Sequence, residues 1–282
     1  MNPLAPEPLA HEVVQSGPSP SRTAFVLHGV LGSGQNFRGL ARALSKQRPD
    51  FRLVLVDLRG HGDSRGAAPP HTLRACAEDL VRLQQHLHSA EQTPVPVSAI
   101  VGHSFGGKVA IAASLLPGFA ELSQVFLLDS NPGPVDPGSD HEVLRLLLAV
   151  RAIEQPLASR DQLVTLLTGQ GFSRGLARWM TTNLRRTDAG YRWRFDLDVI
   201  EQLLQDYFRQ DFWELLGQPR TRPEYHLVAA EKSDRFDGEL RRRAKALPAA
   251  SRCHFHLIPD AGHWLHVDNP TAVLDLLAST LE

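Results

Sequence analysis

The sequence has little cysteine, no excess of either charge and no long apolar run. Cys76 and Cys253 are the two cysteines among 282 residues, and they are far apart. They argue against a disulfide framework and favour a reducing compartment. Lys and Arg number 30 against 31 Asp and Glu, so no overall basic field attracts nucleic acid or an anionic membrane. No run reaches the roughly 18 apolar residues that a spanning helix needs.

The first 22 residues are rich in proline and carry no targeting pattern. They contain five prolines but neither the basic stretch nor the apolar stretch of a signal peptide. We therefore expect a proline-rich extension over residues 1–22, no integral membrane association and a cytoplasmic protein.

Short apolar runs alternate with helix-like stretches through most of the chain. The apolar runs, each ending in turn residues such as Gly, Asp or Ser, cover residues 23–29, 52–60, 97–104, 124–130, 225–231 and 253–263. Strands separated by helices predict βαβ units and a doubly wound, mostly parallel sheet. In such a sheet the residues that handle a ligand lie beyond the carboxyl ends of the strands.

The alternation stops between residues 134 and 222, where the patterns are helical and no strand-like run occurs. We expect a helical lid over 134–222, inserted between a first core segment (23–133) and a second (223–282). Packing onto the body is the simpler role for most apolar side chains of this lid. Those that could instead line an acyl pocket include Leu146, Leu147, Trp179, Trp193 and Phe212.

Residues 102–106 read Gly-His-Ser-Phe-Gly and match the pattern G-x-S-x-G. In this motif a sharp turn between strand and helix lifts the serine hydroxyl above the sheet, and crowding requires small residues two positions to either side. The bare pattern is weak, but here an apolar strand precedes it and a helical run follows. Ser104 is therefore a candidate nucleophile, with a helix N-terminus behind it.

A serine hydroxyl needs a base, usually a histidine that a carboxylate orients. Of the 13 histidines, His263 follows the last apolar run, where the base falls in the chain order serine, acid, histidine. His266, three residues on, is the competitor. His28 and His61 lie in other strand-end loops, and we interpret both as bracing those loops.

Contacts to a substrate are harder to assign. The candidates that we select for substrate binding are His28, Trp179 and Trp264. No pair of histidines has the i, i+4 spacing with an intervening Glu that zinc hydrolases use, so we expect no metal.

An acyl-transfer site also needs N–H donors for the oxyanion. The amide of Phe105, directly after Ser104, is one candidate. The amide of Val30, in the loop after the first apolar run, is the other. The glycines of that loop lack the Lys of a phosphate-binding loop, and no dinucleotide-binding motif follows a strand, so we expect no cofactor.

Two aspartates end apolar runs in places where they could orient His263. Asp129 follows the run after the Ser104 helix, and Asp234 follows the penultimate run. Either loop would lie next to the histidine loop in a doubly wound sheet. The residues alone leave both aspartates open.

Four segments together carry a resemblance to a known family: HGVLGSGQNF, DLRGHGDS, GHSFGGK and GHWLHVDNP. They resemble the α/β-hydrolase superfamily, and in particular its small esterase branch, with LHG-x-LGS-x-x-N-[FW], GHS-x-GGK and GHW-x-H motifs. The resemblance runs from about Thr23 to the C-terminus and implies an α/β-hydrolase fold with a lid. In some members the acid comes from the strand after the nucleophile helix, which favours Asp129 over Asp234.

These features predict a serine hydrolase that forms an acyl-enzyme on Ser104. We expect it to cleave small-molecule carboxylic esters or thioesters with short to medium acyl chains, and to have no nucleic-acid partner. The alternatives are a C–C bond hydrolase, a perhydrolase or a lyase with the same triad, or a small-molecule receptor that retains the triad.

Overall fold

The computed structural model describes residues 7–90, 94–136, 138 and 142–282. Its main sheet consists of the strands β1 (His11–Val14), β2 (Arg22–Leu27), β3 (Phe51–Val56), β4 (Val97–His103), β5 (Gln124–Leu128), β8 (Glu224–Ala230) and β9 (Cys253–Ile258). The strand order is β1-β3-β2-β4-β5-β8-β9, and β1 runs antiparallel to β3 while the other neighbouring pairs are parallel. The predicted doubly wound, mostly parallel sheet is confirmed.

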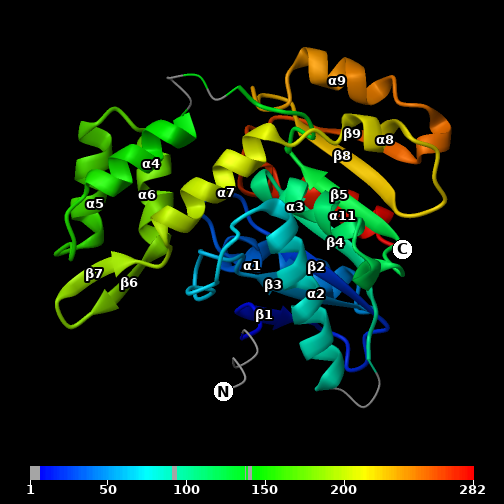
Figure 1. Ribbon diagram of the computed structural model, residues 1–282, viewed down its shortest axis with the longest axis horizontal. Helices are drawn as coiled ribbons and strands as arrows, with labels where there is room; N and C mark the ends of the chain where they lie inside the picture. The colour runs from blue at the N-terminus through cyan, green and yellow to red at the C-terminus, as the bar shows by residue number, and fades with distance from the viewer. Residues whose placement is uncertain (1–6, 91–93, 137, 139–141) are drawn as a thin grey trace.

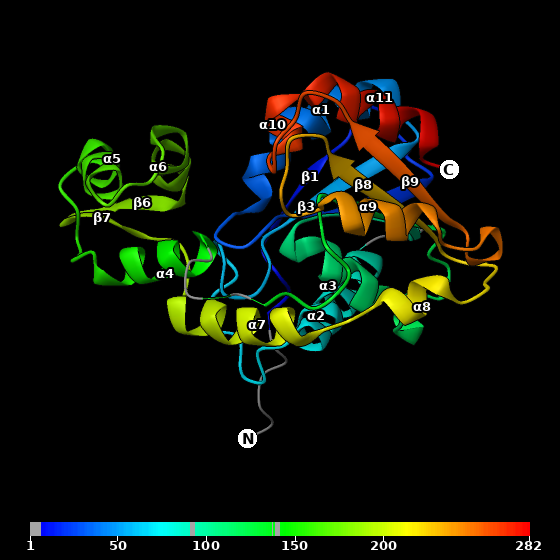
Figure 2. The same ribbon diagram turned by 90° about the horizontal axis from the view of Figure 1, so that it is seen from above.

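Helices cover both faces of this sheet (Figure 2). One face carries α1 (Arg38–Gln47), α10 (Leu265–Asp268) and α11 (Pro270–Thr280). The other carries α2 (Leu73–Ser89), α3 (Phe105–Ser114) and α9 (Gly238–Lys245). Short 3₁₀ turns lie at η1 (Gly34–Phe37), η2 (Pro117–Phe119), η3 (Thr181–Asn183) and η4 (Ala249–Ser251). No helix among the described residues is long and apolar enough to cross a membrane.

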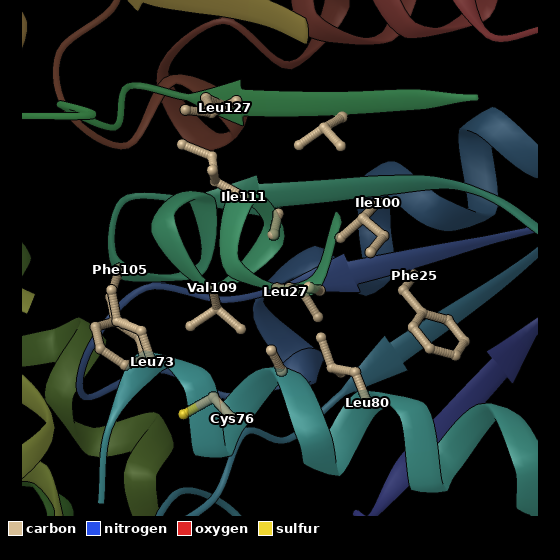
Figure 3. Packing of buried hydrophobic residues seen from close by; sticks show 14 of the residues in the cluster. Phe25, Leu27, Leu73, Cys76, Leu80, Ile100, Phe105, Val109, Ile111 and Leu127 are labelled. Atoms are coloured by element: carbon tan, nitrogen blue, oxygen red, sulfur yellow. The ribbon is translucent and has the colours of Figure 1, made fainter. Parts of the chain in front are cut away.

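The core consists of two layers, one on each side of the sheet. In β2, Phe25 and Leu27 face α2 and α3, whereas Ala24 and Val26 face α1 and α11. Figure 3 shows the first layer, where Phe25 and Leu27 meet side chains of the two helices. Because the central strands are buried on both faces, they read as continuous apolar runs, and this is why sequence patterns found them.

One prediction about the N-terminus is wrong. Residues 1–22 were expected to lie outside the core, but β1 pairs with β3 at the edge of the sheet, with His11 opposite Val56. A strand of four residues with mixed burial is too short to show a periodicity. Residues 1–6 of the expected extension lie outside the described residues.

Residues 134–222, which we call the insertion, separate β5 from β8. The insertion contains α4 (Glu142–Ala152), α5 (Arg160–Gly169), α6 (Arg174–Met180), β6 (Leu184–Thr187), β7 (Gly190–Trp193), α7 (Leu197–Arg209) and α8 (Trp213–Gly217). In Figure 1, α4–α6 and the β6–β7 hairpin form a lobe beside the sheet, and α7 leads from that lobe back to the body.

The insertion departs from the predicted all-helical lid in two ways. The hairpin of β6 and β7 was missed, because each strand has four residues and their sequence is mostly polar. The last helix belongs to the body: Trp213 and Leu216 of α8 lie in the same hydrophobic cluster as side chains of α2 and α3.

Candidate active site

Ser104 occupies the turn between β4 and α3. Its φ of 51° and ψ of −116° lie in a region that L-residues rarely adopt. The turn is held from both sides: the Ser104 N–H donates to Leu128 O at 3.0 Å, and Ser130 Oγ donates to Ser104 O at 2.6 Å. This backbone directs the Ser104 side chain away from the sheet, into the cavities described below.

The glycines around Ser104 are required by close backbone contacts. A Cβ at Gly102 would lie 2.2 Å from Gly106 O, and a Cβ at Gly106 would lie 2.7 Å from His28 O. Neither distance is compatible with a side chain. The glycines therefore let the start of α3 pack directly on the end of β2.

A chain of hydrogen bonds joins Ser104, His263 and Asp129. His263 Nε2 lies 3.1 Å from Ser104 Oγ, and His263 Nδ1 lies 2.8 Å from Asp129 Oδ2. The three residues come from the ends of β4, β9 and β5. The Asp129 side chain is completely buried, whereas that of His263 is 27% exposed. The arrangement allows His263 to accept the serine proton while the carboxylate holds its Nδ1–H.

Asp129 is held by two further donors. The Ala230 N–H donates to Asp129 Oδ1 at 3.0 Å, and Ser233 Oγ donates to Oδ2 at 2.5 Å. Asp234, the alternative acid, points elsewhere: its side chain is 88% exposed and pairs with Arg235 at 3.5 Å. The structure thus brings Asp129, and not Asp234, to His263. Ser233 was missed by sequence reasoning, since a serine in a strand-end loop carries no distinguishing signal.

The loop after β2 passes beside Ser104. A Cβ added at Gly29 would lie 3.3 Å from Ser104 Cβ, so the two backbones are in close contact. Val30 and Phe105 line one cavity together with Ser104. Both candidate oxyanion donors therefore belong to segments that border the serine hydroxyl.

His28 and His61 brace this loop, as we interpreted. His28 Nδ1 donates to Gly29 O at 2.7 Å, and its Nε2 accepts from the Leu58 N–H at 3.0 Å. His61 Nε2 accepts from the Leu31 N–H at 3.2 Å. Burial lowers the pKa of His28 to about 4 and that of His61 to about 3, so both rings are neutral at physiological pH.

The prediction that His28 binds substrate is contradicted by this geometry. The residue is 1% exposed, and both ring nitrogens bond to the backbone. No polar atom of the ring is left to contact a ligand.

His266, the alternative base, forms no hydrogen bond to Ser104 or Asp129, whereas His263 bonds to both. Its ring stacks on Phe37 at 4.2 Å and is 8% exposed. Burial, with a smaller contribution from the nearby His263, lowers the pKa of His266 to about 3. His103, the residue before Ser104, is 4% exposed and bonds through Nε2 to His263 O at 2.8 Å.

Two cavities meet at Ser104. The first has about 630 Å³ of space, counting its open mouth, and the second about 820 Å³. Both are bordered by Val30, Ser104, Val143, Arg235 and His263. Ser104 and His263 therefore border two compartments.

The two cavities differ in their walls. The first is mainly apolar, and its larger lining side chains are Leu31, Phe37, Leu146, Leu176, Trp179 and Trp264. The second mixes apolar and polar side chains: Val135, Leu204, Tyr207, Phe208, Asn131, Asp234 and Asp237. Trp179 and Trp264 have their ring centroids 5.6 Å apart, so they form one wall together.

The residues of the insertion that were candidates for lining an acyl pocket fall into two groups, those that line a cavity and those that only pack in a hydrophobic cluster. Leu146 and Trp179 border the first cavity, in line with the pocket that we expected. Leu147 and Trp193 pack in the hydrophobic cluster of the insertion, to which Leu146 also belongs, but they do not line either cavity. Phe212 packs in the cluster of the body. Their apolar character reflects packing, which residue type alone does not distinguish from pocket lining.

Lys108 of α3 binds the insertion, and the sequence analysis did not identify this residue. It is fully buried, and its Nζ donates to Gly133 O at 2.6 Å, Tyr207 O at 2.8 Å and Gln210 O at 3.0 Å. Burial lowers its pKa to about 7. Lys108 thereby satisfies carbonyls at the C-terminal end of α7.

Among the described residues, no group of three or more His, Cys, Asp or Glu could hold a metal ion.

A serine, a histidine and a buried aspartate at the ends of parallel strands are typical of α/β hydrolases. Residues 24–276 match the alpha/beta hydrolase family, and the chain belongs to that family. It is a hydrolase.

Similar proteins are named as lipases and esterases. The chain is 29% identical to sn-1-specific diacylglycerol lipase ABHD11 of Mus musculus, over 99% of this chain and 86% of that protein. It is 26% identical to Esterase YbfF of Escherichia coli (strain K12), over 88% of this chain and 89% of that one. A solved structure titled "Marine microorganism esterase" has the same fold, with a TM-score of 0.79 at 24% identity over 97% of this chain and 99% of that one.

Proposed function

We propose that this enzyme is a serine hydrolase that cleaves carboxylic esters or thioesters through an acyl-enzyme on Ser104. The observation that carries the proposal is the unbroken chain of hydrogen bonds from Ser104 Oγ through His263 to the buried Asp129. Such a chain converts a poor nucleophile into an effective one. The lipase and esterase names of the relatives support an ester as the substrate.

The reaction proceeds in two halves. His263 Nε2 takes the proton of Ser104 as its Oγ attacks the acyl carbon, and the amides of Val30 and Phe105 bind the oxyanion. His263 then gives the proton to the departing alcohol or thiol. Water attacks the acyl-enzyme in the same way, with His263 again as the base. Asp129 holds the imidazole in the required tautomer and stabilises its charged form. No step of this sequence requires a metal ion or a cofactor.

The first cavity is the compartment that suits the acyl chain. Its walls are mainly apolar, which suits the hydrocarbon part of an acyl group. The preference for short to medium chains stays a prediction. The insertion serves as a lid in this proposal, because Leu146 and Trp179 line the first cavity. The second cavity, with polar residues such as Asn131, receives the leaving group. A small-molecule substrate, no nucleic-acid partner and a cytoplasmic location stay predictions.

Labelling with a fluorophosphonate tests the proposed nucleophile. The probe should modify wild-type protein at one site, and Ser104→Ala should remove both the label and the release of p-nitrophenol from short acyl esters. Label and activity that persist in Ser104→Ala would show that another residue carries the reaction.

A substrate panel tests the class of ester. We would compare p-nitrophenyl esters of graded acyl length with the corresponding acyl thioesters, and add a diacylglycerol because the mouse relative's name states that substrate. Repeated turnover is expected, with kcat/KM highest for short or medium chains. A single round of slow cleavage, together with a ligand-dependent rise of the thermal midpoint, would favour a receptor instead.

A further inference from the structure

Leu31 joins the loop after β2 to the insertion. Its side chain is 1% exposed and lies in the hydrophobic cluster of the insertion, with Met180 and Ile200. Its backbone has a φ of 58°, in the left-handed region that a branched side chain adopts only where its surroundings hold it. The residue directly after Val30 is thus embedded in the insertion.

The peptide groups on both sides of Val30 are held by histidines. Gly29 O, in the peptide that carries the Val30 N–H, accepts from His28 Nδ1 at 2.7 Å. In the following peptide, the Leu31 N–H donates to His61 Nε2 at 3.2 Å. Because N–H and C=O point in opposite directions across a trans peptide, holding Gly29 O sets the direction of the Val30 N–H.

Asn183 of the insertion makes a further hydrogen bond to the backbone of this loop. The residue ends the short helix η3 and is 2% exposed, and its Nδ2 donates to Leu31 O at 2.6 Å. The backbone carbonyl of Asn183 accepts in turn from the Arg194 N–H at 2.8 Å. Asn183 is therefore held by two hydrogen bonds, one at its backbone carbonyl and one from its side chain to Leu31 O.

We propose that Asn183 is a positioning residue for the oxyanion donor. The peptide whose carbonyl Asn183 holds, Leu31 O, also carries the Gly32 N–H, which donates to Gly29 O at 3.1 Å beside the His28 bond. The direction of the Val30 N–H therefore depends on the placement of the insertion. This inference rests on the proposed function, because it takes the Val30 amide as a donor to the oxyanion. Such a bond strengthens in the transition state, so displacing the donor lowers kcat more than it weakens substrate binding. The insertion then contributes to catalysis even for acyl groups too short to contact it.

The first test compares two ways of loosening the insertion, with p-nitrophenyl acetate as the short substrate. Asn183→Ala is expected to lower kcat about 10- to 100-fold, with KM within about threefold of wild type. The matched control is Asp206→Ala. Asp206 lies on α7 and accepts from the Leu73 N–H at 2.7 Å, which joins the insertion to α2 and makes no bond to the Val30 loop. Its kcat should stay within about threefold of wild type even if the thermal midpoint falls.

A trifluoromethyl ketone inhibitor reports directly on the oxyanion. Ser104 Oγ adds to its carbonyl carbon, the serine proton passes to His263, and the carbonyl oxygen becomes an anion at the position that Val30 serves. The inhibition constant Ki for Asn183→Ala should rise by about the factor by which kcat falls. An unchanged Ki would overturn the positioning role.

The isosteric variant Asn183→Asp provides a pH signature. Its ionised carboxyl has no proton to donate to Leu31 O, but the protonated form regains an O–H donor. The ratio of its kcat to the wild-type kcat, which cancels the titration of His263, should rise as pH falls from 8 to 5, because burial raises the pKa of such a carboxyl. A ratio that stays constant with pH would show that donation to Leu31 O plays no part.

Failure of this role can be told apart from failure of the proposed function. Wild-type protein that neither takes up fluorophosphonate nor turns over ester would refute the hydrolase mechanism itself. If wild-type protein does both, while Asn183→Ala and Asn183→Asp keep wild-type kcat and Ki, the positioning role of Asn183 alone is refuted.

Discussion

Asp129→Asn should stop turnover by reversing the tautomer of His263. In the native site, Asp129 Oδ1 accepts from the Ala230 N–H, and Oδ2 accepts from His263 Nδ1. The backbone N–H can only donate, so the amide oxygen of the variant must face Ala230. Its NH₂ group then faces His263, and Nδ1 becomes an acceptor. The ring proton moves to Nε2, which can no longer accept the proton of Ser104.

The magnitude follows from the burial of this contact. The Asp129 side chain has no exposed surface, so water cannot replace the lost carboxylate. The same exchange in a serine triad lowers kcat about 10⁴-fold, which corresponds to about 5.5 kcal/mol of transition-state stabilisation. Asp234→Asn is the matched control. Because its side chain is 88% exposed and its ion pair with Arg235 is solvated, kcat should change by no more than about threefold.

The assay is kcat for p-nitrophenyl acetate, measured on both variants after their thermal midpoints show that they are folded. If Asp129→Asn keeps more than about a tenth of the wild-type kcat, the tautomer argument is wrong. If Asp234→Asn loses about a hundredfold or more, the acid is Asp234 and the hydrogen bond to Asp129 has another role.

Three further predictions concern specificity and stability. Trp179→Ala should lower kcat/KM for hexanoyl esters more than for acetyl esters, and an equal loss across the panel would contradict its place in the acyl pocket. Lys108→Met should lower the free energy of unfolding by about 3 kcal/mol, measured by urea titration, because buried carbonyls lose their donor. Acidification from pH 6.5 to about 4 should also destabilise the protein. The pKa values of His28 and His61 fall to about 4 and about 3 on folding, so below pH 6.5 the unfolded state binds more protons. Each histidine then contributes up to about 1.4 kcal/mol per pH unit, and unfolding free energies that are flat between pH 6.5 and 5 would contradict this.

Much of the fold could be predicted because its signals are local. The six predicted runs became β2, β3, β4, β5, β8 and β9, since strands buried on both faces must be apolar throughout. The elements that were missed, β1 and the β6–β7 hairpin, have four residues each and rest on pairing with a partner strand rather than on their own pattern. The end of the insertion was misassigned for a related reason, since an apolar face does not reveal which core it joins.

Some residues of the candidate site could also be predicted from the sequence, and others could not. Ser104 could be selected from the sequence because backbone crowding requires glycine at positions 102 and 106, which gives a recognisable motif of five consecutive residues. His263 could be selected as the candidate base because chain order in this fold restricts where a base can lie. These are properties of short segments and of topology.

Only the tertiary structure decided which carboxylate meets His263 and what holds the site around it. Asp129 directly follows β5, and Asp234 lies in the loop after β8. The side chain of Asp129 lies buried against His263, whereas that of Asp234 lies in solvent. The bonds of Asn183 to Leu31 and of Lys108 to the end of α7 join residues far apart in the chain. Such contacts depend on where whole elements come to rest, and no single segment encodes them.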